Sequence, residues 1–195
     1  MRVTEKTKTE TRKKIQQAAK RLFASQGFSE TATREISVEA GVAAGTLFNY
    51  FPTKEAIVIS LATEAAQTAT DEYWKRRGDD ATLDEDLFAL LANYLKRLKP
   101  LRKFIQPVID TVLHPVSHDD DSSSSIRTAY FESLHEIFFK HDLENKLTSA
   151  NAHLHWSLVV GVLSFWTTDT SPKQEDTLAL LDQSVQMFLD WLHAN

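Results

Sequence analysis

Residues 33–54 constrain the fold of this chain more than any other stretch of its sequence. They read Thr-Arg-Glu-Ile-Ser-Val-Glu-Ala-Gly-Val-Ala-Ala-Gly-Thr-Leu-Phe-Asn-Tyr-Phe-Pro-Thr-Lys. The apolar spacing predicts two short helices joined by a turn at Gly41, a residue that readily adopts a positive φ. The apolar residues expected to face one another across this turn are Ile36, Ala40, Val42, Leu47 and Phe51.

The outward face of the second short helix is small and uncharged, with hydrogen-bonding and aromatic side chains. A helix that enters the major groove of DNA needs such a face, because bulk keeps it off the base edges and a carboxylate is repelled by phosphate. The pattern therefore predicts a helix-turn-helix that binds DNA. The side chains on this face are Ala43, Ala44, Thr46, Phe48, Asn49 and Tyr50.

Three short motifs in this region resemble the signature of the TetR/AcrR family of bacterial transcriptional regulators. They are Gly41-Val42, Gly45-Thr46-Leu47-Phe48 and Tyr50-Phe51-Pro52-Thr53-Lys54-Glu55. The resemblance is specific over about residues 10–60 and only architectural after them. It implies a homodimer, an all-helical ligand-binding domain and repression that a small molecule relieves. We expect a DNA-binding domain over residues 1–53 and an effector-binding and dimerisation domain over residues 54–195.

The charge distribution favours DNA binding at one end of the molecule only. The net charge is −5, yet residues 1–60 contain ten Lys and Arg against six Glu, a local charge of +4. The remaining residues carry −9. A basic N-terminal end on an otherwise acidic protein presents only that end to phosphate. The alternative interpretation is that the N-terminal lysines are simply a solvated run of charges.

Composition excludes several other functions. The chain has no Cys, so disulfides, thiolate catalysis and Cys-ligated metal are ruled out. His114 and His118 are four positions apart but straddle a proline, so no two of the seven His residues form the i, i+4 pair of a helical zinc site. No catalytic Ser, His and Asp motif is present. We expect no cofactor and no enzymatic activity. The longest apolar stretch, residues 156–166, is too short to span a membrane, and the start is polar, so a cytosolic protein is expected.

Apolar periodicity predicts an all-α fold of nine helices, three for DNA and six for the rest. The first is expected over about 11–26, the next two lie on either side of Gly41, and the others cover about 54–77, 82–100, 101–114, 126 onward, 144–168 and 172–193. Gly27 is expected to end the first helix with a left-handed cap.

Other local signals mark boundaries and an irregularity. Thr33 and Thr53 are predicted N-caps, and Thr82-Leu-Asp-Glu85 is a capping box. Pro107 is expected to kink its helix. Residues 115–125, with three Asp and four consecutive Ser, are expected to form a polar loop.

Each exposed residue near the turn has an expected role. Asn49 can pair with an adenine edge and the Thr46 methyl group can meet a thymine methyl, although a solvated polar residue is the alternative for Asn49. Tyr50 can donate to phosphate. Arg34 and Lys54 are cations at helix N-termini, where the helix dipole disfavours them unless DNA is near.

Three positions depart from the family's pattern. Phe48 stands where the family usually has Tyr with its hydroxyl on phosphate, and Ala43 and Ala44 replace a common Ser-Lys or Ser-Arg pair. The departures predict that DNA affinity depends more on the N-terminal arm and on Lys54.

The last two helices carry more apolar residues than one core face requires, which predicts a dimer interface with twofold symmetry. A wholly intramolecular core is the alternative. The residues concerned are Leu154, Leu158, Val162, Phe165 and Trp166 on one helix and Leu178, Leu181, Val185, Phe188, Leu189 and Leu192 on the other.

Aromatic residues of the fourth to eighth helices are candidates for the wall of an effector cavity. Such a cavity suits a small apolar or aromatic effector. The candidates are Tyr94, Phe104, Phe131 and Trp156, with ordinary core packing as the alternative for each.

The expected function is a homodimeric, ligand-responsive repressor that binds a palindromic operator of its own or neighbouring genes. The resemblance implies that effector binding moves the fourth helix and changes the spacing of the two recognition helices, with the helix around Pro107 as relay. Two alternatives remain open. One is a helical small-molecule carrier or interaction protein with a non-functional helix-turn-helix, and the other is an enzyme with a helical pocket.

Overall fold

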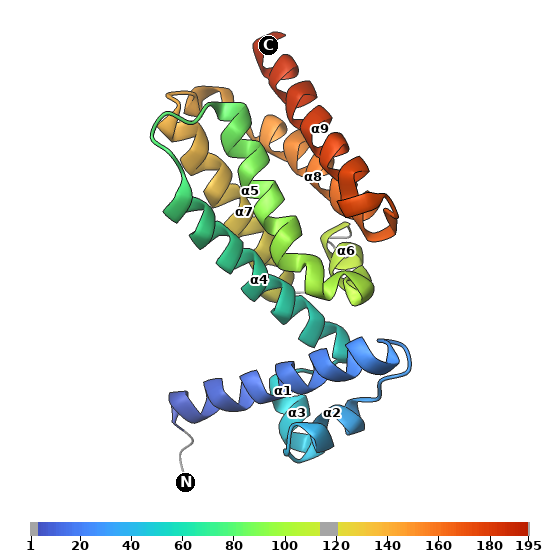
Figure 1. Ribbon diagram of the computed structural model, residues 1–195. Helices are drawn as coiled ribbons and strands as arrows, with labels where there is room; N and C mark the ends of the chain where they lie inside the picture. The colour runs from blue at the N-terminus through green and yellow to red at the C-terminus, as the bar shows by residue number, and fades with distance from the viewer. Residues whose placement is uncertain (1–3, 114–120, 195) are drawn as a thin grey trace.

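A computed structural model describes residues 4–113 and 121–194. Within these residues the chain forms nine α-helices, three short 3-10 helices and no strand, which confirms the predicted all-α fold (Figure 1). The α-helices are α1 (Glu5–Gln26), α2 (Thr33–Glu39), α3 (Ala44–Tyr50), α4 (Lys54–Arg76), α5 (Leu83–Leu98), α6 (Gln106–Leu113), α7 (Asp121–Lys140), α8 (Ser149–Thr168) and α9 (Glu175–Ala194). The 3-10 helices are η1 (Lys99–Phe104), η2 (Glu144–Lys146) and η3 (Pro172–Gln174).

Helices α1 to α3 form a small N-terminal unit at one end of the molecule (Figure 1). The predicted contact across the turn is confirmed, since Ile36, Leu47 and Phe51 are each at most 1% exposed. Ala40 and Val42 are half-buried against the same core. This packing fixes the angle between α2 and α3.

Helix α4 leaves the N-terminal unit and continues through the larger C-terminal bundle (Figure 1). Its predicted cap is confirmed, because the Ala56 amide donates to Thr53 Oγ1 at 3.1 Å. The helix contacts α1 near its start and then packs along α5 and α7. Helices α8 and α9 pack together on the other side of α5, with α6 against α8.

The two units also meet through an aromatic contact. The rings of Phe23 in α1 and Phe104 in η1 lie 5.2 Å apart between centroids, and both side chains are buried. The N-terminal unit is therefore packed on the C-terminal bundle through side chains as well as through α4.

The ends of α1 and the start of α2 differ from the sequence-based expectation. Helix α1 starts at Glu5, earlier than predicted, because Thr4 caps it and accepts from the Thr7 amide. Gly27 has φ 95° and ψ 156°, a positive φ but outside the left-handed helical region that we predicted. The N-cap of α2 is Ala32 and not Thr33, because the Glu35 carboxylate accepts from the Ala32 amide at 2.8 Å.

The segment around Pro107 is interrupted two residues before the proline and is not the single kinked helix that we predicted. The expected helix over residues 101–114 is divided into η1 and α6, and Pro107 is the second residue of α6. Proline is tolerated in the first turn of a helix, where its missing amide would have no intrahelical acceptor. Residue 114 lies outside the described residues.

The predicted loop over residues 115–125 is wrong in its second half. Residues 121–125 belong to α7, and residues 115–120 lie outside the described part of the chain. Serine competes with helix formation only weakly in a first turn, and an aspartate at a helix N-terminus is favoured by the dipole. The last two helices also begin later than expected, at Ser149 and Glu175, each after a short 3-10 turn.

Candidate DNA-binding surface and effector cavity

The turn between α2 and α3 is closed by backbone and small side chains. Gly41 has a φ of 66°, in the left-handed region as predicted. The Val42 amide donates to the Ser37 carbonyl at 2.9 Å, and Ser37 is buried. The turn thus sets the direction of α3.

Helix α3 turns one side into the core and the other to solvent. Leu47 is fully buried, while Ala43, Ala44 and Asn49 are exposed and Phe48 is 49% exposed. Thr46 and Tyr50 are half-buried, and Tyr50 packs against the core. The predicted readout residues share one open surface, which is the geometry that base recognition needs. Their contacts with DNA remain a prediction.

Arg34 lies in the first turn of α2 and is exposed. Its guanidinium forms no hydrogen bond or ion pair with any described residue. An uncompensated cation at a helix N-terminus is available for a phosphate or a guanine edge.

Lys54, in contrast, is engaged within the chain. Its ammonium group donates to the carbonyl oxygens of Phe28, Ser29 and Thr31 at 2.8, 3.2 and 3.3 Å. It also lies 4.5 Å from the centroid of the Phe28 ring. An ammonium group has three hydrogens, so these three carbonyls use its whole donor capacity. The phosphate contact expected of Lys54 would require it to leave these acceptors.

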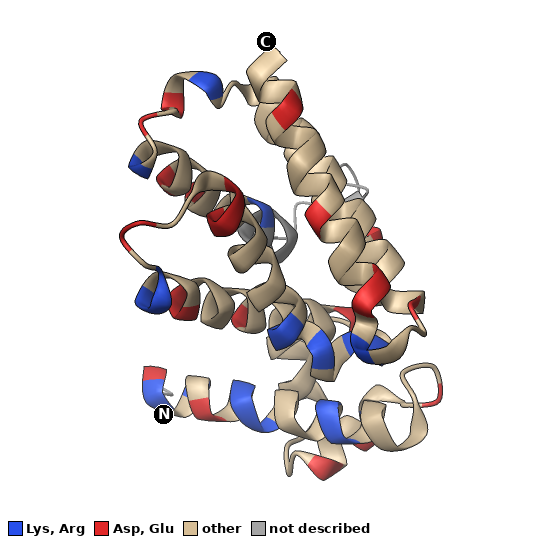
Figure 2. Cartoon of the chain, turned by 45° about the horizontal axis from the view of Figure 1, so that its top comes forward, with Lys and Arg blue, Asp and Glu red and all other residues tan. Residues whose placement is uncertain are grey.

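Among the other cations of the N-terminal unit, Lys8 and Arg21 form surface ion pairs with Glu5 and Glu39. Arg12 turns inward, where Nη2 donates to Ser60 Oγ at 2.7 Å and the guanidinium lies 4.5 Å from the Phe51 ring centroid. Within the described part of the N-terminal unit, five exposed cations have no ion pair or hydrogen bond from their charged group, and Figure 2 shows basic positions along α1. These five are Lys6, Lys13, Lys14, Lys20 and Arg34.

A polar cluster joins α1 to α4 beside the point where the two units meet. Gln16 Nε2 donates to Ser60 Oγ at 3.1 Å and to Glu64 Oε1 at 2.7 Å. Gln16 is buried, and Ser60 also accepts from Arg12. A shift of α4 at this level must therefore move α1 or break these bonds.

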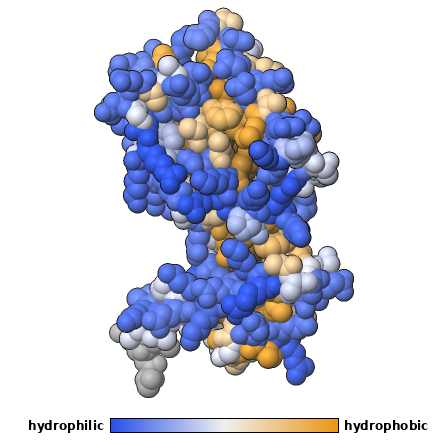
Figure 3. Space-filling model, in the orientation of Figure 1, coloured by the Kyte–Doolittle hydropathy of each residue, from blue (hydrophilic) through white to orange (hydrophobic). Residues whose placement is uncertain are grey.

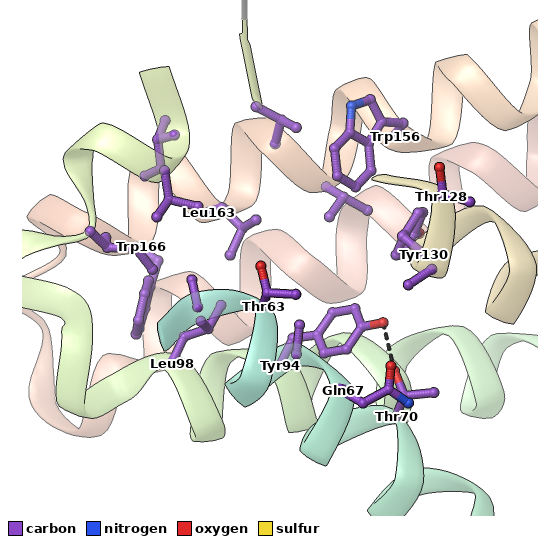
Figure 4. Close-up of a pocket in the computed structure, with 18 of the residues that line it drawn as sticks. Thr63, Gln67, Thr70, Tyr94, Leu98, Thr128, Tyr130, Trp156, Leu163 and Trp166 are labelled. Carbon is purple, nitrogen blue, oxygen red and sulfur yellow. Dashed lines mark hydrogen bonds between the residues drawn. The ribbon is translucent and has the colours of Figure 1, made fainter. Parts of the chain in front are cut away.

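The C-terminal bundle encloses a cavity of about 330 Å³ that opens to the surface. Its wall is mainly apolar, with polar groups concentrated on α4 and α7 (Figure 4). Its size and character are those of a small-molecule site. The lining residues are Ala62, Thr63, Ala66, Gln67 and Thr70 of α4, Tyr94 and Leu98 of α5, Ile105, Val108 and Ile109 in and before α6, Thr128, Ala129, Tyr130 and Glu132 of α7, and Trp156, Val159, Val160, Leu163 and Trp166 of α8.

The structure places two of the four aromatic candidates on this cavity and two elsewhere. Tyr94 and Trp156 line it (Figure 4). Phe104 is buried against Phe23, and Phe131 packs beside Trp156, with 5.9 Å between ring centroids. Neither Phe104 nor Phe131 is a lining residue. The expectation that all four share one wall is therefore not met by the geometry.

Hydrogen bonds hold the tyrosines of the cavity wall. The hydroxyl groups of Tyr94 and Thr70 are 2.9 Å apart, as drawn in Figure 4. The Tyr130 hydroxyl lies 2.5 Å from His155 Nδ1, and His155 packs edge-on against Phe188 of α9. Burial lowers the pKa of His155 to about 3 and raises the pKa of Tyr130 well above its usual value. Both groups are uncharged at neutral pH.

Several lining residues were missed by sequence reasoning. Tyr130 lines the cavity, and neither it nor its buried hydrogen-bond partner His155 carries a motif that separates it from ordinary core residues. A signal did exist on α4, where Ala62 and Ala66 alternate with Thr63 and Gln67. Small side chains on one face of a long buried helix leave space that larger ones would fill.

Helices α8 and α9 expose apolar side chains. Of the eight large apolar residues that are exposed in the described chain, five lie on these two helices. Figure 3 shows a band of apolar side chains down the middle of the C-terminal bundle. Most of the residues predicted for the dimer interface, among them Val162 and Phe188, are instead buried in the protomer core. The five exposed residues are Leu154, Phe165, Leu178, Met187 and Trp191.

The residues that the structure describes show neither a metal-binding cluster nor a membrane-spanning helix. They contain no group of three His, Asp or Glu side chains placed to hold a metal ion. None of their helices is long and apolar enough to cross a membrane.

Comparisons with known proteins extend over both units. Residues 15–61 match the family described as bacterial regulatory proteins, tetR family, and residues 87–195 match the tetracyclin repressor-like C-terminal domain. An HTH-type transcriptional regulator of Staphylococcus aureus is 22% identical over 130 residues, which are 67% of this chain and 66% of that protein. The Bacillus subtilis HTH-type regulator YuxN is 38% identical over 52 residues, 27% of this chain and 18% of its own length. The chain thus spans less than two thirds of these two relatives.

Solved structures share the fold over nearly the whole chain. The TetR-family repressor FadR of Thermus thermophilus, in complex with lauroyl-CoA, has a TM-score of 0.73 at 22% identity, with 91% of this chain and 93% of that chain covered. The fatty acid degradation regulator FadR of Bacillus halodurans has a TM-score of 0.60 at 20% identity, covering 92% and 94%. Because both of its domains match, the chain belongs to the TetR family of bacterial regulatory proteins, whose members are DNA-binding transcriptional regulators and not enzymes.

Proposed function

We propose that this protein is a homodimeric, ligand-responsive repressor that binds a palindromic operator of its own or neighbouring genes. The observation that carries the proposal is the course of α4. This helix begins four residues after α3, bonds α1 through Ser60 and lines the cavity from Ala62 to Thr70. A ligand that displaces α4 therefore acts on the element that positions the DNA-reading surface.

The effector of this proposal is a small, mainly apolar molecule. Its support is the cavity of about 330 Å³ with aromatic and aliphatic walls. The structurally similar FadR of Thermus thermophilus was solved with lauroyl-CoA, an acyl compound with a long apolar chain. That likeness supports an apolar occupant here.

The regulatory step is a shift between two arrangements of the dimer. A ligand changes operator affinity only to the extent that it binds one arrangement better than the other. The polar cluster of Arg12, Gln16, Ser60 and Glu64 is the contact through which the cavity acts on α1, since Glu64 follows the lining residue Thr63 directly. We assign the relay to this cluster in place of the helix around Pro107.

Dimerisation through α8 and α9 is supported by their exposed apolar residues. Leu154, Leu158 and Phe165 recur on one side of α8, and Met187 and Trp191 lie one turn apart on α9. A twofold axis through such a surface pairs each helix with its mate and places two recognition helices on successive major grooves, about 34–36 Å apart.

Selection of bound sequences from a random duplex library tests the DNA-binding half of the proposal. The expected result is an enriched palindrome, with binding that weakens steeply with salt because lysines release counterions from DNA. Adding 1-decanol, an uncharged apolar probe, is expected to release the selected duplex. A helical carrier would give no enriched sequence and no steep salt dependence.

A further inference from the structure

The rim of the cavity between α4 and α7 carries hydrogen-bond acceptors. The Thr63 hydroxyl donates its hydrogen to the Ile59 carbonyl at 2.9 Å, so only its oxygen lone pairs remain for a ligand. The Gln67 amide nitrogen donates to Asp71 Oδ1 at 3.0 Å, which fixes the amide with one hydrogen committed and its oxygen uncommitted. Both residues line the cavity.

Helix α7 contributes a carboxylate to the lining of the cavity. Glu132 of α7 lines the cavity, is exposed, and forms no ion pair or hydrogen bond with any described residue. Thr128, one turn earlier on the same helix, lines the cavity beside it.

No described residue of the cavity wall carries a positive charge. None of the lining residues in the described ranges is Lys, Arg or His. The Trp156 indole nitrogen is a neutral donor, and it lies on the ring edge turned away from Tyr94 and Thr70 (Figure 4). A carboxylate or phosphate head at this rim would meet Glu132, and no cation among the described lining residues would balance the repulsion.

We infer that the cavity selects an apolar ligand with a cationic, hydrogen-bond-donating head group such as a protonated amine, and that the Glu132 carboxylate recognises this group. The inference rests on the proposed effector function and names the chemical class of the effector. The apolar body lies against Tyr130, Trp156 and Leu163, and the ammonium group lies at the rim, where Thr63 and Gln67 supply oxygen acceptors.

Three ten-carbon probes of equal chain length separate the head-group contribution from the apolar contribution. Binding of decylamine, 1-decanol and decanoate to the full-length protein at pH 7 is measured by isothermal titration calorimetry, below the concentration at which the probes aggregate. The apolar chain supplies the same burial in each case. Because Glu132 is exposed and its field is screened, we expect decylamine to bind about two- to five-fold more tightly than 1-decanol, and decanoate to bind most weakly.

Glu132→Gln is the decisive variant, and Glu136→Gln is its matched control. Glu136 lies one turn further along α7, is also exposed and does not line the cavity. Removal of the Glu132 charge should make decylamine and 1-decanol bind about equally, whereas the control keeps the preference. Circular dichroism checks that both variants are folded, as expected for substitutions at the surface.

The other outcomes overturn the inference in distinguishable ways. Decanoate that binds wild-type protein as tightly as decylamine would refute the cationic class while leaving an apolar effector in place. A preference that persists in Glu132→Gln would refute the assignment to Glu132. If none of the probes binds, both the inference and the apolar effector of the proposed function fail, while the duplex selection still tests DNA binding separately.

Discussion

The Lys54 ammonium group donates to the carbonyl oxygen of Phe28 at 2.8 Å and so ties the start of α4 to the loop between α1 and α2. Two more carbonyls of this loop, those of Ser29 and Thr31, complete its coordination. Sequence reasoning assigned this lysine to phosphate because the helix dipole disfavours a cation at an N-terminus. Three carbonyl dipoles offset that penalty equally well, so the position of the charge is explained within the protomer.

Lys54→Met should therefore lower stability more than it changes DNA binding. The substitution keeps the apolar stem over Phe28 and leaves three carbonyls without their donor, which costs about 1.5–3 kcal/mol for hydrogen bonds to a charged group. Urea denaturation measures this loss. The control Lys14→Met, at an exposed lysine without a described partner, should leave stability unchanged. Full stability of Lys54→Met together with a salt slope flatter by about one unit would restore the phosphate assignment.

Asn49→Ala should reduce specificity. Asn49 is exposed on α3 and forms no hydrogen bond with any described residue, so its amide is free to pair with an adenine edge. Loss of that pair should weaken binding to the selected operator by about 1–3 kcal/mol and leave binding to random duplex unchanged. Competition binding assays on both duplexes measure the difference. Equal losses on the two would show that Asn49 does not read a base.

Gly161→Leu tests the dimer surface without disturbing the protomer. Gly161 lies on the exposed side of α8 between Leu158 and Phe165, and a Cβ built there meets no atom within 4 Å. Leucine also has a helix propensity better by about 1 kcal/mol, so the protomer should be at least as stable. If the partner's helices approach closely here, the larger side chain should displace them, and sedimentation should find monomers. A dimer of unchanged stability would place the interface elsewhere.

The sequence predicted most of the fold because its signals were local. The turn at Gly41, the cap at Thr53 and the capping box at Thr82 each depend on residues a few positions apart, and all three are present. The errors also have local causes. Pro107 and the serines of residues 122–125 are compatible with either a helix start or a break, and tertiary packing decides between them.

The cavity was less predictable because it depends on contacts between distant segments. Phe104 and Trp156 look alike as aromatic residues in helical patterns. One packs on Phe23, 81 positions earlier in the chain, and the other faces a space left by the alanines of α4. Nothing in the local sequence of either residue encodes that difference.

Stability should fall at mildly acidic pH because of His155. Burial depresses its pKa from 6.5 to about 3, so the folded state stays unprotonated while the unfolded state binds a proton. Above pH 6.5 the imidazole is mostly neutral in both states, so the free energy of unfolding is at its full value. As the pH falls from 6.5 toward 3, the free energy of unfolding decreases by about 1.36 kcal/mol per pH unit. Between pH 7 and pH 5 the loss should be about 2 kcal/mol.

His155→Gln isolates this contribution from the other six histidines. Glutamine keeps an acceptor for the Tyr130 hydroxyl but does not titrate. Urea denaturation at pH 7 and pH 5 should show a smaller loss for the variant than for the wild type. The same loss in both proteins would mean that another group causes the pH dependence.

Phe104→Ala and Trp156→Ala should separate core packing from ligand binding. Phe104 is 4% exposed and joins η1 to α1 through Phe23, so its truncation should cost about 3–5 kcal/mol and lower the melting temperature. Trp156 is half-buried on the wall of the cavity, so its truncation enlarges a space that is already open and should cost much less stability. Its effect should appear in ligand binding, as weaker calorimetric binding of 1-decanol with operator affinity retained. Phe104→Ala should bind 1-decanol as the wild type does at temperatures where it is folded. The reverse pattern, with a stable Phe104→Ala that no longer binds 1-decanol and an unstable Trp156→Ala that still does, would move the effector site away from the cavity between α4 and α8.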